Sequence, residues 1–556
     1  MPEYLSPGVY IEEIPSGPVP IEGVSTSTAG FVGQTARGPD TVRLITSWLD
    51  YVRWYGGYTD PGAGQGYLPY AIQGFFNNGG KRAYIARVKP TGAVAASAVI
   101  PAAVGNSRLP VRAVGTGTWG NSLRVFVFRG ELYEDNKPTL KNLMKVVVAL
   151  YKGAPPDTLY DPTRADLIFE DDYVGPEDIE VFDNVVFDPD APNYVVSVVN
   201  GSSRFIALGS ATHGQPDFLN GSPALLKLSE EVDVPNSPHK QHTPVALAGG
   251  NDGGPPGRDD YTGDADRPAG QPDKWTGLAA LEAVRDVALV CVPDHADVGG
   301  LTGRVVQHCE RLKNRFCVLH KERGFDPSGS GVVPDADTSY GAQYLPWINI
   351  VDPTGVGTVT IPPSGHVTGV IARTDLDRGV HKAPANEDLR GILVQDLGDT
   401  KPLERMIDDG TQASLNPVGL NVIRDFRDRG RGVKVWGART MSSDGQWKYI
   451  NVRRLFIFVE ESVRRGTQWV VFEPNDAYTW QRVASSVRNF LTTVWKNGAL
   501  VGATPEEAFF VRCDLTTMTP DDIDNGRLVC LVGIAPVKPA EFVIFRFSQK
   551  TIEAES

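Results

Sequence analysis

The chain has 556 residues, 41% of them hydrophobic, and a formal net charge of −13. At roughly 150 residues per domain, this length predicts about three or four domains with sizeable cores. The acidic balance argues against a broad nucleic-acid-binding surface, which needs basic side chains to displace counterions from phosphates. We therefore predict no nucleic-acid partner.

The cysteine content and the N-terminus indicate a cytoplasmic protein. The five cysteines are odd in number and sparse, so they predict a reducing compartment rather than a disulfide framework. They are Cys291, Cys309, Cys317, Cys513 and Cys530. The opening MPEYLSPGVYIEEI lacks a basic segment followed by an apolar run, and no stretch of about 18 apolar residues exists. We expect no signal peptide and no direct membrane insertion.

Residues 1–25 are a proline-punctuated terminal segment. Gly8–Ile14 is its strand-like run, and prolines on both sides separate this run from the neighbouring sequence. Two interpretations remain open. The run is either a frayed tail or edge strand of its own domain, or an arm that adds itself to a sheet in another copy.

Residues 26–90 have an α/β pattern. Thr28–Gly33 is typical of a buried strand, and Ser47 with Asp50 forms a capping box that opens a short helix. Tyr67–Asn78 has apolar residues at helical spacing and stops before two glycines, and Lys81–Val88 alternates like a strand.

Residues 91–245 are predicted to form a β-rich insertion, followed by a Gly/Pro/Asp-rich linker or loop over 246–273. The Asn200-Gly201 dipeptide predicts a hairpin between its last two strands. The four predicted strands are Leu123–Arg129, Lys145–Tyr151, Asn193–Val199 and Arg204–Leu208.

Residues 274–445 return to α/β alternation, which predicts a mostly parallel sheet. We expect helices at Leu278–Val284 and Val305–Lys313. We expect strands at Val287–Val292, Phe316–Leu319, Tyr344–Ile350 and Thr358–Ile361.

Residues 446–537 are predicted to form an α+β C-terminal domain, and residues 538–556 a C-terminal arm. The two helices are Val452–Arg465 and Asp476–Lys496, followed by β segments at Phe509–Asp514 and Leu528–Ala535 and a strand at Glu541–Gln549. One apolar stripe runs along the second helix. Its members are Trp480, Val483, Val487, Phe490, Leu491 and Val494.

Basic residues on these two helices have two open interpretations. They form either a solvated face with ion pairs to Glu460 and Glu461, or a surface that docks on an acidic partner. They are Arg453, Arg454, Arg464, Arg465, Arg482, Arg488 and Lys496.

Three patterns share residue types with chemical sites, and each lacks a sequence feature that such a site usually has. Gly115, Gly117 and Gly120 match a dinucleotide motif in letters, but a strand follows where a helix is needed, so we predict a turn and no cofactor. Two further sets stand in the α/β region. His308, Cys309, Cys317 and His320 lack the paired spacing of a zinc site, so we predict no metal. Asp294, His295, His308, Ser364 and His366 include the residue types of a hydrolase triad but no nucleophile motif.

Several segments resemble contractile tail sheath proteins of phage tails and related injection systems. The most specific are Val435–Asp476, which includes VWGARTMSSDGQWKYINVRRLF, and Ala503–Gln549, which includes NGRLVCLVGIAPVKPAEFVIFRF. Shorter similar stretches are YLSPGVYIEEI, FFNNGGKRAYIARV, GTWGNSLRV, LAGGNDG and HKAPANEDLRGI. The resemblance is thinnest over about 126–245.

This resemblance implies a fold and a mechanism. The α/β domain would have subtilisin-like topology without protease activity, and the terminal strands would be exchanged between neighbouring subunits. The implied arm residues are Val9, Tyr10, Ile11, Phe542, Val543, Ile544, Phe545 and Phe547. The C-terminal domain would face an inner tube through one of its two helices, Val452–Arg465 or Asp476–Lys496. We favour the longer helix, which would present Arg482, Arg488 and Lys496.

The implied function is structural and not enzymatic. Subunits would stack as a helical cylinder around the tube and contract from a metastable extended state. The implied partners are other copies of the chain, the tube protein, the baseplate and terminal cap proteins. Two alternatives remain open, an α/β hydrolase and a carbohydrate- or surface-binding module in the 91–245 insertion.

Overall fold

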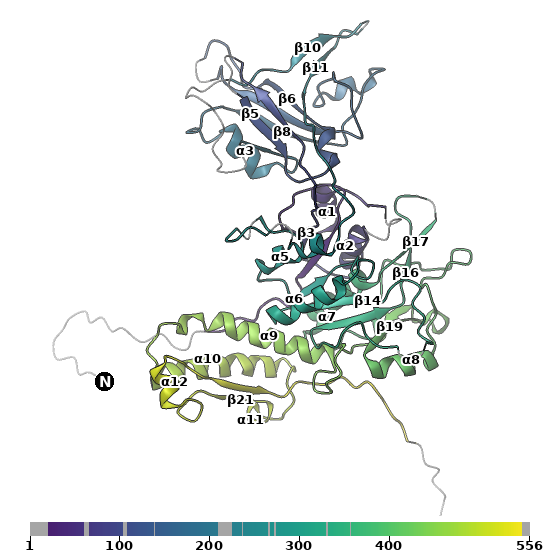
Figure 1. Cartoon of the computed structure of the whole chain (residues 1–556), viewed down its shortest axis with the longest axis vertical. Coiled ribbons are helices and arrows are strands. Elements are labelled where there is room, and N and C mark those ends of the chain that lie inside the picture. The colour runs from purple at the N-terminus through teal and green to yellow at the C-terminus, as the bar shows by residue number, and fades with distance from the viewer. Residues whose placement is uncertain are drawn as a thin grey trace, which may run out of the picture.

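A computed structural model describes residues 20–60, 66–103, 108–137, 140–209, 225–235, 237–264, 267–271, 274–329, 332–355 and 357–546. Figure 1 shows three stacked parts: a β-rich insertion at the top, an α/β domain in the middle and a helical C-terminal domain at the bottom.

The α/β domain is built on the largest sheet of the described residues, which has nine strands in the order β18-β20-β19-β15-β14-β13-β1-β3-β2. The six from β19 to β3 run parallel. At the edges, β2 pairs antiparallel with β3, β20 with β19, and β18 with β20. The prediction of a mostly parallel sheet is confirmed. The strands are β1 (Ala29–Gly33), β2 (Arg43–Ile45), β3 (Ala83–Arg87), β13 (Leu289–Cys291), β14 (Phe316–His320), β15 (Gly341–Leu345), β18 (Glu387–Asp388), β19 (Leu420–Asp425) and β20 (Val433–Val435).

Helices cover both faces of this sheet because its strands are apolar on both faces. Phe31 of β1 packs into one core, with helices α2 (Leu68–Asn77) and α7 (Ser364–Arg378), and its neighbour Val32 packs into the other, with α5 (Gly277–Glu282) and α6 (Leu301–Leu312). Helices α2 and α7 approach closely through glycines, since a Cβ on Gly365 would collide with Ala71 and one on Gly369 with Phe75.

Smaller elements complete this domain. Helix α1 (Trp48–Tyr55) begins where the capping box predicts, with the Ser47 hydroxyl accepting from the Asp50 amide at 3.1 Å. The predicted run Tyr344–Ile350 is two strands, because β15 stays in the main sheet while β16 (Ile348–Val351) pairs with β17 (Thr358–Ile361). Other elements are α4 (Arg258–Thr262), inside the predicted linker, and α8 (Asp409–Leu415).

The insertion lies between β3 and α4 and buries its own core between two sheets. One sheet has the order β4-β5-β9 and the other β12-β6-β7-β8, with the hairpin β10-β11 at the periphery. The elements are β4 (Ser97–Pro101), β5 (Arg108–Ala113), β6 (Leu123–Arg129), β7 (Met144–Leu150), β8 (Asp178–Val185), α3 (Val195–Ser202), β9 (Ile206–Leu208), β10 (Glu230–Asp233), β11 (Lys240–Thr243) and β12 (Val245–Ala246).

The predicted strand Asn193–Val199 and its Asn200-Gly201 hairpin are wrong. This segment is helix α3, and Asn200 lies in its last turn, where its side chain binds the backbone of Leu208. Val195 and Val199 are fully buried one helical turn apart, so packing onto the insertion core overrides the strand preference of the valine run.

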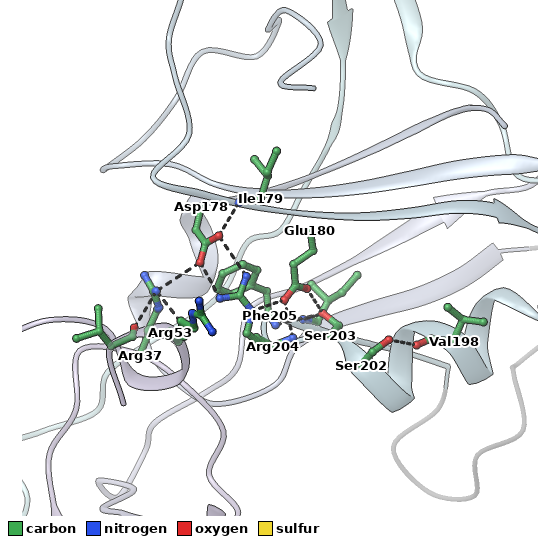
Figure 2. A network of polar contacts seen from close by, with 12 residues as sticks. Arg37, Arg53, Asp178, Ile179, Glu180, Val198, Ser202, Ser203, Arg204 and Phe205 are labelled. Atoms are coloured by element: carbon green, nitrogen blue, oxygen red, sulfur yellow. Dashed lines mark hydrogen bonds and ion pairs between the residues drawn. The ribbon is translucent and has the colours of Figure 1, made fainter. Parts of the chain in front are cut away.

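A network of charged side chains joins the insertion to the α/β domain. Figure 2 shows Asp178 of β8 between Arg204 of the insertion, 2.9 Å away, and Arg37 of the α/β domain, 3.9 Å away. Arg204 also pairs with Glu180 at 2.8 Å, and Arg37 donates to the backbone oxygen of Val52 in α1. Half-buried charges therefore fix this junction.

The C-terminal domain packs two long helices against a two-stranded sheet. Helix α9 lies between the α/β domain and α10, and β21 lies below α10 (Figure 1). All six members of the predicted apolar stripe are buried in one cluster with residues of β21. The elements are α9 (Ile450–Gly466), α10 (Ala477–Lys496), α11 (Pro505–Ala508), β21 (Phe509–Arg512), α12 (Pro520–Asp524) and β22 (Leu531–Ile534).

Candidate assembly interface

The C-terminal segment runs away from the body of the molecule (Figure 1). Phe542, Val543, Ile544 and Phe545 are 71%, 69%, 77% and 76% exposed. Residues 541–546 form no strand in the single chain, contrary to the expectation of a strand from Glu541. A strand is defined by its hydrogen-bonded neighbour, and no strand of the described residues pairs with 541–546, so this β-prone sequence forms no ladder there.

Glu541 fixes the root of this segment to the α/β domain. Its carboxylate accepts from Arg439 at 2.7 and 2.6 Å, from Asn416 at 2.8 Å and from the Tyr449 hydroxyl at 3.2 Å, with Lys448 at 3.7 Å. Burial acts to raise the pKa of Glu541, but the hydrogen bonds from Arg439 and Asn416 outweigh it and lower that pKa. The segment therefore has a fixed origin and an exposed apolar end.

The two-stranded sheet β21–β22 offers edges to an incoming strand. Its register pairs Phe509 with Ile534 and Arg512 with Leu531, and no third strand of the described residues joins it. Its outer face carries exposed apolar side chains, with Phe510 47% and Leu531 51% exposed. Unpaired strand edges next to apolar side chains are typical of sites for strand addition.

The N-terminal arm lies outside the described residues, and so do its predicted residues Val9, Tyr10 and Ile11 as well as Phe547 of the C-terminal arm. The described chain begins beside α9. The Val24 amide donates to the Ser462 hydroxyl at 3.1 Å, and a Cβ on Gly466 would lie 2.7 Å from Ile21. Residues 21–24 thus enter the molecule along the C-terminal domain.

The basic residues of α9 have structural roles inside the chain. The Arg454 guanidinium binds Asp375 at 2.8 and 2.6 Å, with both side chains almost fully buried. Arg453 stacks on Trp447, 3.4 Å from the ring centroid. Arg464 and Arg465 both bind Glu461, which agrees with the expectation of local ion pairs for that carboxylate.

The three basic residues predicted to face the tube differ in exposure. Arg482 of α10 stacks on Trp469, 4.4 Å from the ring centroid, and lies 4.0 Å from Glu473. Its guanidinium therefore already contacts residues of its own chain. Arg488 and Lys496 are exposed, and within the described residues neither has an acidic group in ion-pair range. They are therefore the two cations of this set that remain available to a partner.

The candidate triad residues do not converge on a catalytic arrangement. The Asp294 carboxylate accepts from the Tyr261 hydroxyl at 2.7 Å and from the amides of Gly66 and Tyr67 at 3.1 and 3.0 Å, and none of these donors is a histidine. Asp294 follows β13 at the carboxyl end of the sheet, beside the β1–β13 crossover where open α/β sheets bind ligands. Here the carboxylate ties two loops together instead.

A serine–histidine pair does form elsewhere in the core. The Ser364 hydroxyl lies 3.1 Å from His320 Nδ1, although sequence analysis placed His320 in the candidate metal set. Both side chains are fully buried, and the remaining nitrogen of His320 has no hydrogen-bond partner. No carboxylate orients this histidine among the described residues, so the pair lacks the third member of a triad.

The candidate metal and dinucleotide motifs are explained by packing. Within the described ranges, no group of three or more His, Cys, Asp or Glu is placed to hold a metal ion. His308 lies 3.3 Å from Arg315, and Cys309 and Cys317 are buried in the core between α6 and β14. The glycine motif is a turn, as predicted, because a 3-10 helix at Thr118–Ser122 leads directly into β6.

We predict that acid weakens the folded monomer. Burial lowers the pKa of His295 and His366 to about 4 and of His308 to about 3, and it holds the pKa of His320 well below its usual value. These residues are neutral in the fold and take up protons on unfolding, so their contribution is present above pH 6.5 and is lost as pH falls toward 4. Burial also raises the pKa of three carboxyl groups, of Asp294 to about 6 and of Asp297 and Glu460 above their usual values, and these groups act in the opposite sense.

We expect the four buried histidines to outweigh these carboxyl groups, so the urea concentration at the unfolding midpoint of the monomer should decrease as the pH is lowered from 7 to 5. Each histidine contributes at most about 1.4 kcal/mol per pH unit. Unfolding curves at pH 7, 6 and 5 check this. A midpoint that rises on acidification contradicts it.

None of the helices in the described ranges combines the length and hydrophobicity that a bilayer crossing requires.

Comparison with solved structures supports the fold at full length. A sheath complex of an extracellular contractile injection system (PVC) in the contracted state is 21% identical, covers 99% of both chains and gives a TM-score of 0.54. The contracted helical sheath of the anti-feeding prophage is 23% identical, covers 98% of this chain and 99% of that one and gives 0.53. A sheath tail protein from Listeria innocua is 12% identical, covers 93% and 96% and gives 0.56.

Curated relatives match over shorter stretches. A putative prophage major tail sheath protein of Pseudomonas aeruginosa is 25% identical over 212 residues, which is 37% of this chain and 52% of the relative. The tail sheath protein of Enterobacteria phage T4 is 27% identical over 271 residues, 48% of this chain and 37% of the relative. The chain thus spans about half the length, or less, of these relatives.

Two family models match consecutive parts of the chain. The phage tail sheath protein central domain matches residues 267–441, and the phage tail sheath C-terminal domain matches residues 442–550. Together they cover just over half of the 556 residues, including the α/β domain from α5 onward and the whole C-terminal domain. The chain belongs to the phage tail sheath protein family.

Proposed function

We propose that this chain is the sheath subunit of a contractile tail or injection system. It polymerises as a helical cylinder around an inner tube and contracts from a metastable extended state to drive the tube through a target envelope. The observation that carries this proposal is the C-terminal segment, which is anchored at Glu541 and then exposes four consecutive apolar side chains. Another copy of the chain can pair with this segment and bury its apolar side chains.

Strand exchange explains how the subunits connect. A strand from one copy can satisfy the unpaired edge of β21 or β22 in another copy. Each hydrogen bond contributes about 1 kcal/mol net, so an arm of five or six residues supplies roughly 3–5 kcal/mol before the cost of ordering it. Head-to-tail contacts of this kind generate a helical polymer where they do not close into a ring.

The α/β domain serves as a scaffold with the topology of subtilisin and without its activity. The order β2-β3-β1-β13-β14-β15-β19, with helices on both faces, supports this topology. Contraction needs no nucleotide, because better packing between subunits in the contracted state supplies the work. Subunits assemble in the cytosol and act within a released or anchored particle.

The proposed partners are copies of the same chain, the tube, the baseplate and a terminal cap. Similar structures include a baseplate of the anti-feeding prophage, 23% identical over 99% of this chain, which supports a baseplate contact. The hydrolase alternative is not favoured, because the Ser364–His320 pair is buried and no carboxylate of the described residues orients it. The relatives are sheath proteins, which also weighs against a binding module as the main function.

Electron microscopy of the purified protein tests the proposal. We expect helical cylinders or stacked rings, either from the protein alone or after addition of its tube protein. A sample that stays monomeric in the presence of tubes, at concentrations where its fold is intact, would falsify the assignment.

Charge reversal on α10 tests the tube-facing surface. The double variant R488E/K496E should fold normally, because both side chains are exposed, and should lose growth on tubes by at least about tenfold. Sedimentation of tube-bound sheath measures the effect. R482E is unsuitable, since Arg482 stacks on Trp469 and its loss affects folding. Wild-type growth by the double variant would place the tube contact elsewhere.

A further inference from the structure

Two of the five cysteines meet at one end of the β21–β22 sheet. Cys513 follows β21 and Cys530 precedes β22. The register pairs Arg512 with Leu531, and one step further along it places Cys513 opposite Cys530. Opposite residues of an antiparallel pair have Cα atoms about 4.5 or 5.5 Å apart, within the span of about 4.4–6.8 Å that a disulfide bridges.

The two thiols also share one face of the sheet and touch each other. Both belong to the apolar cluster under α10, where Cys513 is 7% exposed and Cys530 is half-buried. A side-chain hydrogen bond joins them, and it lowers the pKa of Cys530 and raises that of Cys513. The more accessible sulfur is thus also the more readily ionised one, and thiolates are the reactive form.

We propose that Cys513 and Cys530 form an oxidisable dithiol that closes to an intramolecular disulfide across the end of the β21–β22 sheet. With a small disulfide such as oxidised glutathione, the Cys530 thiolate attacks one sulfur and expels a glutathione thiolate. Cys513 then loses its proton and attacks Cys530, and the second glutathione leaves. The two cysteines lose two electrons and two protons, and one glutathione disulfide becomes two glutathione thiols.

A second thiol pair in the same chain provides the contrast. Cys309 of α6 and Cys317 of β14 also share a side-chain hydrogen bond, but both are 0% exposed in the core of the α/β domain. A reagent in solution has no access to them in the folded state, so only the C-terminal pair is expected to react. Cys291 is likewise 0% exposed.

The disulfide would fix the sheet that the proposed function assigns to strand exchange. It would close the loop 514–529 and hold the end of the ladder in register, so that an incoming arm meets edges of constant geometry. The dithiol would persist in the reducing cytosol, and the bond would form once the particle reaches an oxidising medium. This consequence rests on the proposed function, whereas the formation of the bond does not.

Thiol titration of the full-length monomer tests the bond directly. After incubation with oxidised glutathione and removal of reagent, the denatured protein should show three free thiols instead of five. Its mass should fall by about 2 Da, and peptide mapping should link Cys513 to Cys530. C530S should form no internal link, while the C309S/C317S variant should still lose two thiols. Five remaining thiols, or a link between other positions, would overturn the proposal.

Thermal unfolding tests whether the disulfide stabilises the C-terminal domain. Oxidation should raise the melting temperature of the C-terminal domain by about 5 °C in the wild type and leave C530S unchanged. A wild-type melting temperature that does not change on oxidation would contradict a stabilising role of the disulfide. If C530S does not fold, mapping of the wild type still decides whether the bond forms. Failure of both redox forms to assemble on tubes would count against the proposed function and not against the disulfide.

Discussion

Replacing Phe542, Val543, Ile544 and Phe545 together by serine is expected to abolish sheath assembly and to leave the stability of the monomer unchanged. Each of these side chains is at least 69% exposed, so the folded monomer loses almost no buried apolar area. In the assembled sheath the same side chains would be buried on a neighbouring subunit. Negative-stain microscopy with tubes measures assembly, and thermal unfolding measures the monomer.

The matched control removes exposed apolar surface from the insertion. Ile168 and Phe169 are 51% and 85% exposed, and the variant I168S/F169S should assemble like the wild type. Cylinders of normal length from the fourfold serine variant would show that the C-terminal segment does not connect subunits. A loss of assembly in both variants would point to a general requirement for apolar surface instead.

The ion-pair cluster at Glu541 fixes the point at which the C-terminal segment leaves its own subunit. Arg439 binds the carboxylate through two nitrogens, and such bidentate pairs fix direction as well as position. The backbone up to residue 541 is therefore held by its own subunit, and under the proposed function the residues beyond it would pair with the neighbour. Under the proposed function, whole subunits could then rotate against each other during contraction while the connection between them is kept.

Local patterns predicted most elements of the α/β and C-terminal domains correctly. The strand β1 reads as a short apolar run because it is buried on both faces, and α10 shows its stripe because one face packs on a core. In both cases a local sequence period reports directly on burial. The same reasoning failed at α3, where β-branched valines favour a strand but the insertion core accepts a helix.

The charged residues of the candidate interface could not be predicted from sequence. Arg453 and Arg454 look like members of a solvated basic face, yet both are buried, because their partners Trp447 and Asp375 lie elsewhere in the chain. Glu541 is likewise recognisable as an anchor only once Arg439 is placed beside it. Long-range pairs leave no local period in the sequence, so they escape any argument from spacing.

Replacing Arg454 of α9 is expected to cost more stability than any other single change proposed for this chain. Arg454 and Asp375 are 4% and 2% exposed at their side chains, and Arg454 also donates to the backbone oxygen of Thr26 at 2.8 Å. R454M leaves the Asp375 carboxylate buried and unpaired, which typically costs about 3–5 kcal/mol. Urea unfolding followed by circular dichroism and tryptophan fluorescence measures this loss.

The double variant R454M/D375L separates charge desolvation from packing. Because it removes both charges, its free energy of unfolding should lie within about 2 kcal/mol of the wild type. If the losses of the two single variants simply added, the double variant would be much less stable than this. The control R82M breaks the half-exposed pair with Asp286 and should cost less than about 1 kcal/mol. Additive losses in the double variant would contradict a coupled pair. Since this pair ties α9 to α7, coupling would also mean that the C-terminal domain moves with the α/β domain as one body during contraction.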